Sequence, residues 1–321
     1  MIERIDFAPL DGITKLVFRQ VWHRHFGGAD RYFIPFFSPT DHHTITPRDF
    51  REIDPETNRG MPVVPQVMSC KAPDFIWAAE QLQNMGYGEV NLNLGCPSGT
   101  VTAKGKGSGF LAKPEELDRF FDEVFSHVQI PVSVKTRMGI QSAEEFPRLL
   151  EIYNRYPIAC LTIHARVQKE KYRGTVHLEE FGEALANSKN PVCYNGDLRT
   201  VAEVRALEAQ FPQENAVMIG RGAVADPALL RKLRGGSAAT KEELQTFLQD
   251  LYQSYQEFYG QVGTAAQRMR EVWFYLIHLF ADAEKLNKRL RRFKNPGEYE
   301  MIQAAIFQEL DLRQDSQGDL I

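Results

Sequence analysis

Eight short apolar runs recur at fairly regular spacing through the first 220 residues, and they constrain the fold more than any other feature of the sequence. Each run is rich in Val, Ile or Phe, and its length suits a buried parallel strand better than a helix. The runs are residues 5–10, 32–36, 63–68, 90–94, 132–135, 161–165, 192–195 and 217–220.

Segments with helical periodicity lie between these runs, at residues 74–85, 114–125, 200–209 and 226–233. Eight strands that alternate with helices predict an α/β fold, a TIM (β/α)8 barrel over residues 1–235. A doubly wound open sheet is the structural alternative. The count of eight, and the lack of a GxGxxG after the first run, favour the barrel.

The pattern changes at residues 234–240, where a Gly/Ser/Ala stretch indicates a linker. Only helical segments follow, at 241–259, 264–281, 283–293 and 297–309. We therefore expect a C-terminal all-helical domain over residues 241–321.

Composition limits the class of protein. Charged residues make up 25% of the chain, as in an ordinary globular protein, and no apolar run approaches the roughly 18 residues that a membrane helix needs. The four cysteines form no CxxC pair and no metal-like spacing. We expect a cytoplasmic protein with no metal and no membrane contact. The net charge of −4 argues mildly against nucleic acid, although only a local patch must be basic.

Polar side chains follow most of the apolar runs, at the end of a barrel where active sites lie. They include Gln66, Asn93, Lys135, His164, Arg166 and Asn195. Buried polar groups are costly unless paired, so a ligand with many hydrogen-bonding atoms is expected there. Asn195-Gly196-Asp197 and Gly220-Arg221-Gly222 follow the last two runs, where barrels often bind phosphate. Ordinary turns are the alternative for each glycine segment alone.

Cys96 follows the fourth run and precedes a Gly-rich segment, residues 99–109, which we expect to be an exposed, mobile lid. A thiol at this position can donate or accept a proton. A lone cysteine is more often a small buried apolar residue, which is our interpretation of Cys160 and Cys193. Cys70 is undecided and leans toward a structural role.

The segment Asn91-Leu92-Asn93-Leu94-Gly95-Cys96-Pro97, followed by glycines 105, 107 and 109, resembles the signature of the tRNA-dihydrouridine synthases. The other strand ends agree with that family in order over residues 5–235. Leu10 replaces the family's common Met, and Ala165 and Val167 replace its usual Gly and Thr.

The resemblance implies FMN as cofactor, NADPH or NADH as reductant, and reduction of a tRNA uridine to 5,6-dihydrouridine. Hydride would pass from flavin N5 to C6, and Cys96 would deliver a proton to C5. Asn93 and Arg166 would contact the substrate. The implied FMN-binding residues are Pro9, Leu10, Asp11, Gln66, Lys135, His164, Asn195, Gly196, Asp197, Gly220 and Arg221.

Residues 285–294 carry six positive side chains and no acidic one. Helical spacing would place Lys285, Lys288, Arg289 and Arg292 on one face and turn Leu286, Leu290 and Phe293 inward. Together with Arg268 and Arg270 these cations are the predicted tRNA contacts, because the resembled family holds tRNA with such a domain. A solvated surface helix is the alternative. No obligate protein partner is indicated.

Two other functions stay open. An FMN barrel acting on a free pyrimidine, such as dihydroorotate, would need no basic tail. A catalytically idle RNA-binding module would not need Cys96. The sequence does not indicate which uridine is modified.

Overall fold

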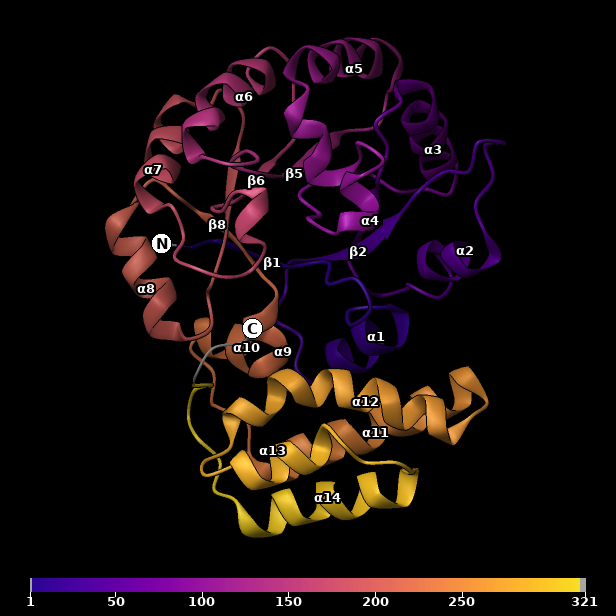
Figure 1. Ribbon diagram of the computed structural model, residues 1–321, viewed down its shortest axis with the longest axis vertical. Helices are drawn as coiled ribbons and strands as arrows, with labels where there is room; N and C mark the ends of the chain where they lie inside the picture. Colours follow the sequence, from indigo (N-terminus) through magenta and orange to yellow (C-terminus); the bar gives the residue numbers. More distant parts are fainter. Residues whose placement is uncertain (1, 318–321) are drawn as a thin grey trace. The chain divides into compact units, whose positions relative to one another are not determined.

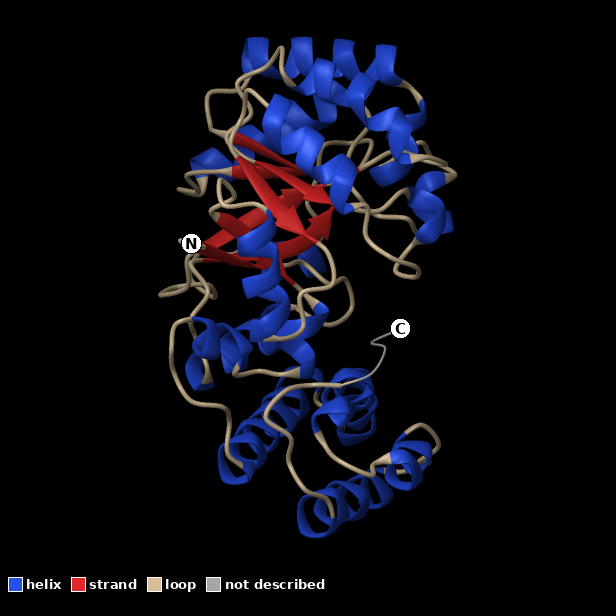
Figure 2. Ribbon diagram, turned by 90° about the vertical axis from the view of Figure 1, so that its left-hand side faces the viewer, coloured by secondary structure: helices blue, strands red, loops and turns tan. Residues whose placement is uncertain are grey.

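The computed structural model describes residues 2–317, and its strands form a closed, all-parallel barrel in the order β1 to β8 (Figure 2). The strands are β1 (Arg4–Phe7), β2 (Arg31–Phe37), β3 (Val63–Val67), β4 (Val90–Leu94), β5 (Val132–Arg137), β6 (Leu161–His164), β7 (Val192–Asn195) and β8 (Ala216–Ile219). All eight predicted runs are therefore confirmed as strands, and the open-sheet alternative is wrong.

Helices follow the strands, as the periodicity predicts. The helices up to residue 233 are α1 (Leu16–His25), α2 (Pro47–Ile53), α3 (Ala72–Asn84), α4 (Gly99–Thr102), α5 (Pro114–His127), α6 (Phe146–Tyr153), α7 (Leu178–Asn187), α8 (Val201–Gln210), α9 (Arg221–Ala225) and α10 (Leu229–Leu233). Figure 1 shows α3, α5, α6 and α7 side by side around the strands. The predicted helix over 226–233 is wrong at its start, because Asp226 precedes a proline and is extended, which separates α9 from α10.

The chain divides into two compact units, and the division does not follow the linker. The first unit comprises residues 1–9, 31–196 and 208–218, and the second comprises 10–30, 197–207 and 219–321. In the first unit, small and apolar side chains fill the barrel interior, among them Ala8, Phe33, Val64, Cys160 and Cys193. The expected burial of these two cysteines is confirmed, although Cys160 also accepts a hydrogen bond from Arg4 Nη2 at 3.0 Å, so its contacts are not purely apolar.

The second unit contains the C-terminal helices α11 (Lys241–Tyr259), α12 (Val262–Leu276), α13 (Glu284–Leu290) and α14 (Pro296–Glu309). Thr240 and Asn295 cap α11 and α14, because each side chain accepts a hydrogen bond from a backbone N–H in the first turn. Gly260 ends α11 in the left-handed region, at φ 64°. No helix among the described residues is both long and apolar enough to span a bilayer.

Two predicted helices are shorter than expected. α12 ends at Leu276 and continues as a single 3-10 turn over Ile277–Leu279. α13 ends at Leu290, so Arg292 lies beyond the helix and shares no helical face with Lys285. Leu286, Leu290 and Phe293 are nevertheless buried, as the spacing of apolar residues predicts.

Candidate active site

Cys96 lies two residues beyond the end of β4, and its backbone is held by the side chain of Asn93. The Asn93 Oδ1 atom accepts hydrogen bonds from the backbone nitrogens of Gly95 and Cys96, each at 3.0 Å. The Cys96 side chain is half-buried, and none of the four cysteines forms a disulfide among the described residues. This turn presents a thiol at the rim of the barrel where the strands end.

The segment over residues 99–109 is only partly the exposed lid that we expected. Its first half contains α4 and has no buried residue. Its second half folds into a 3-10 helix, Gly107–Ala112, in which Gly107, Ser108, Phe110 and Leu111 are buried. Ser108 donates from its Oγ to the Cys96 carbonyl at 2.8 Å, and its backbone nitrogen donates to the same oxygen at 3.1 Å. Ser108 therefore fixes the backbone carbonyl of Cys96, a role that the local sequence pattern does not indicate.

Gln66 lies inside the barrel on β3 and is fully buried. Its Nε2 donates to Asn91 Oδ1 at 2.7 Å, and its Oε1 accepts from Asn93 Nδ2 at 2.7 Å. The predicted site residues Gln66 and Asn93 are thus brought into direct contact with each other.

Lys135 extends from β5 toward β7, where its Nζ donates to Asn195 Oδ1 at 2.9 Å. Asn195 in turn donates from Nδ2 to the Met218 carbonyl at 2.7 Å. Burial, together with the nearby charge of Arg137, lowers the pKa of Lys135 to about 7. A cation so poorly solvated gains much from an anionic or carbonyl ligand.

Arg137 is a residue to which the sequence prediction gave no role. Its Nε donates to the Gly95 carbonyl at 2.7 Å, and its Nη1 donates to the Val167 carbonyl at 3.1 Å. Burial lowers its pKa to about 10, and the ring of Tyr172 lies 5.4 Å from its guanidinium carbon. Tyr172 is 43% exposed and comes from an irregular loop, so no periodic signal could have identified it.

His164 and Arg166 lie on either side of the end of β6. His164 is almost fully buried, and its ring is 6.3 Å from that of Tyr172. Arg166 donates to the carbonyls of Arg173 and Gly174 at 3.0 and 2.6 Å, so its guanidinium holds the loop that carries Tyr172. Substrate contact by Arg166 stays a prediction.

Gly196 and Pro9 are the other predicted FMN-binding residues that lie in the first unit. Pro9 follows β1 and is half-buried. Gly196 has φ 149°, which L-residues rarely adopt, and a Cβ there would lie 3.0 Å from Val176 Cγ1.

The second unit carries the remaining predicted FMN residues. Leu10 and Asp11 open a turn in which Asp11 pairs with Lys15 at 2.9 Å. Arg221 donates to Asp197 at 2.5 Å, and Gly220 leads directly into α9. Gly222 has no room for a side chain, because a Cβ would lie 2.1 Å from the Leu198 carbonyl oxygen.

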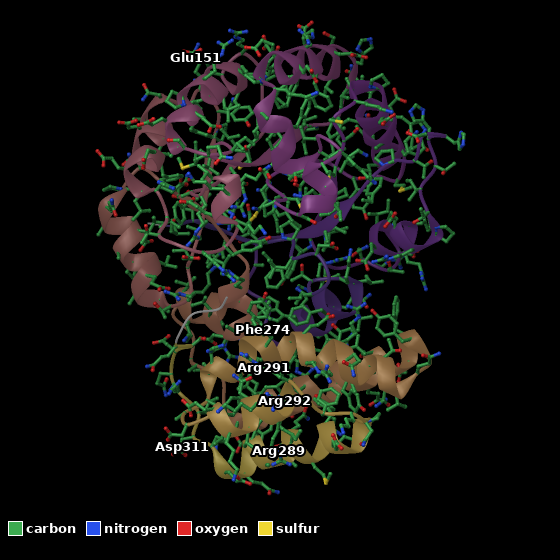
Figure 3. The ribbon with its side chains drawn as sticks, viewed as in Figure 1. Glu151, Phe274, Arg289, Arg291, Arg292 and Asp311 are labelled. Carbon is green, nitrogen blue, oxygen red and sulfur yellow. The ribbon has the colours of Figure 1, made fainter. Side chains whose placement is uncertain are left out.

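The predicted RNA-binding cations differ in how tightly they are held. Lys285, Lys288, Arg289, Arg291 and Arg292 are all exposed. Figure 3 labels the three arginines of this set around the end of α13, and Arg291 lies 5.7 Å from the ring centre of Phe274.

Arg268 and Arg270 on α12 both form contacts with other residues of the protein. Arg268 pairs with Glu271 at 2.8 Å. Arg270 donates to the Phe293 carbonyl at 2.7 Å and lies 4.1 Å above its ring, so it anchors the basic segment. RNA contact by either arginine stays a prediction.

Comparison with known proteins identifies related sequences and folds. The family model described as "Dihydrouridine synthase (Dus)" matches residues 6–311. A Synechocystis protein named "Probable tRNA-dihydrouridine synthase 1" is 31% identical over 84% of this chain and 78% of its own length. The "tRNA-dihydrouridine(16) synthase" of Cupriavidus necator is 27% identical over 94% of this chain and 96% of its own. The structure of morphinone reductase has a similar fold, with a TM-score of 0.53, 15% identity, and coverage of 74% of this chain and 87% of that one.

Proposed function

The chain belongs to the dihydrouridine synthase family, and we propose that it reduces a uridine of tRNA to 5,6-dihydrouridine with a bound FMN and NADPH or NADH as reductant. The observation that carries the proposal is the half-buried thiol of Cys96, held by Asn93 and Ser108 at the rim of the barrel. The enzyme is an oxidoreductase, as its family is.

The donor set at the strand ends fits FMN. Lys135 offers a half-buried, poorly solvated cation with a lowered pKa, as suits the carbonyl-rich or anionic edge of a flavin ring. Gln66 and His164 are also proposed to contact FMN, at its ring or its ribityl chain. FMN, when bound, would supply the hydride that adds to C6 of the uracil ring.

The phosphate end is proposed to bind after β7 and β8. In the first unit, the positive φ of Gly196 suits close approach of a phosphate. In the second unit, the guanidinium of Arg221 suits an anionic group. Asn195 of the first unit, and Asp197 and Gly220 of the second, stay predicted phosphate contacts. Pro9, Leu10 and Asp11 are proposed to line the ring on the side of β1.

In this proposal Cys96 gives its proton to C5 of the same uracil, which completes the reduction. Its thiol becomes a thiolate, which regains a proton from water before the next turnover. The neighbouring guanidinium of Arg137 favours that transient negative charge. Asn93 supports the reaction by holding the backbone of Cys96.

A uridine inside folded RNA must leave its stack to reach such a site. We propose that the exposed cations of residues 285–294 hold the tRNA while this occurs. Position 16 is the first candidate site, because a full-length relative is named for it.

The test is dihydrouridine mapping. Purified enzyme with NADPH should form dihydrouridine at a discrete position of tRNA transcribed without modifications, and the protein should carry flavin absorbance. Reduction of free uracil or oxidation of dihydroorotate, with no change in tRNA, would instead support the free-pyrimidine alternative. A protein that binds tRNA but takes up no FMN would be an RNA-binding module.

A further inference from the structure

We infer that a one-directional chain of hydrogen bonds through the barrel sets the orientation of the Asn93 amide, and that Ser133 and Glu89 at its far end are positioning residues for Cys96. The inference rests on the proposed function of Cys96. It extends that function to two residues that lie at the start of β4 and β5, away from the rim.

The chain is continuous from the Cys96 backbone to a carboxylate. After the Asn93 and Gln66 links described above, Asn91 Nδ2 donates to Ser133 Oγ at 2.8 Å. Ser133 Oγ then donates to Glu89 Oε1 at 2.5 Å. Strand register makes this possible, because Gln66 pairs with Asn91 and Asn91 pairs with Ser133 on adjacent strands.

The two ends of this hydrogen-bond chain determine the direction in which its bonds are donated. A backbone N–H can only donate, so Asn93 must turn its oxygen toward Gly95 and Cys96. A carboxylate can only accept, so Ser133 must give its proton to Glu89. Each amide between these ends therefore has one satisfied orientation, and reversing any of them would set two donors or two acceptors against each other.

The carboxylate end is itself held in place. Arg31 Nη1 donates to Glu89 Oε2 at 2.8 Å, and its other nitrogens hold Asp6 at 3.0 and 2.7 Å. Burial alone would lower the pKa of Arg31, but the hydrogen bond and charge of Asp6 raise it. Glu89 is thus an acceptor fixed by a permanent cation.

Removal of the Ser133 hydroxyl would disturb the other hydrogen bonds of this hydrogen-bond chain, one after another. Asn91 Nδ2 would be buried without an acceptor, and turning the amide would force Gln66 and then Asn93 to turn as well. Asn93 would then present its nitrogen to the N–H groups of Gly95 and Cys96. The result is either a strained interior or a loosened turn at the thiol.

A network of this kind could also serve only to stabilise the barrel, so the test needs a matched control. Thr162 on β6 is equally buried, and its hydroxyl has no hydrogen-bond partner among the described residues. Ser133→Ala and Thr162→Val each remove one buried hydroxyl from the barrel, but only the first breaks the chain.

Two readouts on the flavin-loaded enzyme separate positioning from stability. The first is the rate of Cys96 alkylation by iodoacetamide, followed by mass spectrometry. The second compares flavin reduction by NADPH with flavin reoxidation by saturating tRNA.

For Ser133→Ala we expect alkylation to change at least threefold and reoxidation by tRNA to slow about 10- to 100-fold, with reduction by NADPH within twofold of wild type. Thr162→Val should match wild type in both readouts. Equal behaviour of the two variants, or equal slowing of both half-reactions in Ser133→Ala, would overturn the inference.

Glu89→Gln provides the second variant if Ser133→Ala does not fold. Glu89 is half-buried, so the substitution is tolerable. Ser133 and Arg31 donate to different oxygens of Glu89, so the amide nitrogen of glutamine would face one of these two donors. We expect the same pattern with a smaller, roughly threefold loss of the tRNA half-reaction. If wild type leaves tRNA unreduced, the proposed function fails, and the alkylation rates still decide whether the chain positions Cys96.

Discussion

The hydroxyl oxygen of Ser108 lies 2.8 Å from the carbonyl oxygen of Cys96, twelve residues earlier in the chain. The same oxygen also accepts the Ser108 backbone N–H. With Asn93 holding the N–H of Cys96, both backbone groups of this residue are tied, and its thiol is presented by a rigid turn. Rigid presentation of a reacting group is what efficient proton transfer requires.

Replacement of the thiol should stop proton delivery without loss of the cofactor. We expect Cys96→Ala to slow dihydrouridine formation by about 10²- to 10⁴-fold and to leave flavin content unchanged. Cys70→Ala is the matched control, because Cys70 is also half-buried and follows a strand end. Quantifying dihydrouridine in tRNA digests checks both, and equal rates for Cys96→Ala and wild type would remove the thiol from the mechanism.

Flavin affinity should depend on pH through Lys135, whose pKa is about 7 in the folded protein, against 10.5 ordinarily. The charged form binds an anionic ligand, so affinity of the apoprotein for reduced FMN should fall as pH rises above 7, by at most about tenfold per unit. The stability of the apoprotein should change with pH in the opposite direction to its affinity for FMN. Between pH 7 and 10.5 the unfolded state binds more protons, so the contribution of Lys135 to stability rises with pH.

Anaerobic titration of the apoprotein with reduced FMN between pH 6 and 9, with the free flavin quantified after ultrafiltration, measures this effect. Lys135→Met should bind FMN more weakly and with a flatter pH profile. A wild-type profile as flat as that of the variant would show that Lys135 does not contact the ligand.

Gly107 should tolerate no side chain. Its φ is 56°, and a Cβ would lie 2.9 Å from the Cys96 carbonyl oxygen. We expect Gly107→Ala to cost about 1–2 kcal/mol of unfolding free energy and to lower kcat by displacing Cys96. Gly99→Ala in the same segment is the control, because nothing lies within 4 Å of its Cβ position. Thermal melts and turnover assays measure the two effects separately.

The exposed cations after Glu284 should govern affinity for tRNA. Arg289→Ala should raise KM for tRNA severalfold with kcat nearly unchanged, and should reduce the slope of log affinity against log salt by about 1. Arg119→Ala, which removes an exposed arginine from α5, should change neither quantity. Filter binding across a range of salt concentrations would contradict the prediction if both variants gave the wild-type slope.

The two arginines of α12 should differ in stability. Arg270→Ala loses a hydrogen bond and a stacked ring at 4.1 Å, and we expect it to cost about 1–3 kcal/mol. Arg268→Ala loses a partly exposed ion pair with Glu271 and a more distant ring contact, 5.7 Å from the ring centre of Tyr259, and should cost less than about 1 kcal/mol. Chemical denaturation measures both, and similar losses would contradict the anchoring role of Arg270.

Local pattern was sufficient to predict the barrel. The eight strands were recognisable because Val, Ile and Phe buried on both faces form short apolar runs, and Cys96 was recognisable because it follows one of them. The C-terminal helices were predicted for a similar reason, since 3.6-residue periodicity is a property of neighbouring residues. Helix ends were less predictable, as the early end of α13 illustrates, because capping and packing decide them.

Partners far apart in the sequence were decided only by the tertiary structure. The contact of Tyr172 with Arg137 depends on how the ends of β5 and β6 meet. The contacts of Ser108 with Cys96, and of Arg166 with Gly174, depend on how a loop folds back on itself. The chain from Glu89 to Asn93 depends on the register of three strands, which periodicity cannot specify. Periodicity determines which face of an element is buried, whereas a hydrogen bond needs its two atoms within about 3 Å, and only the closed barrel brings them that near.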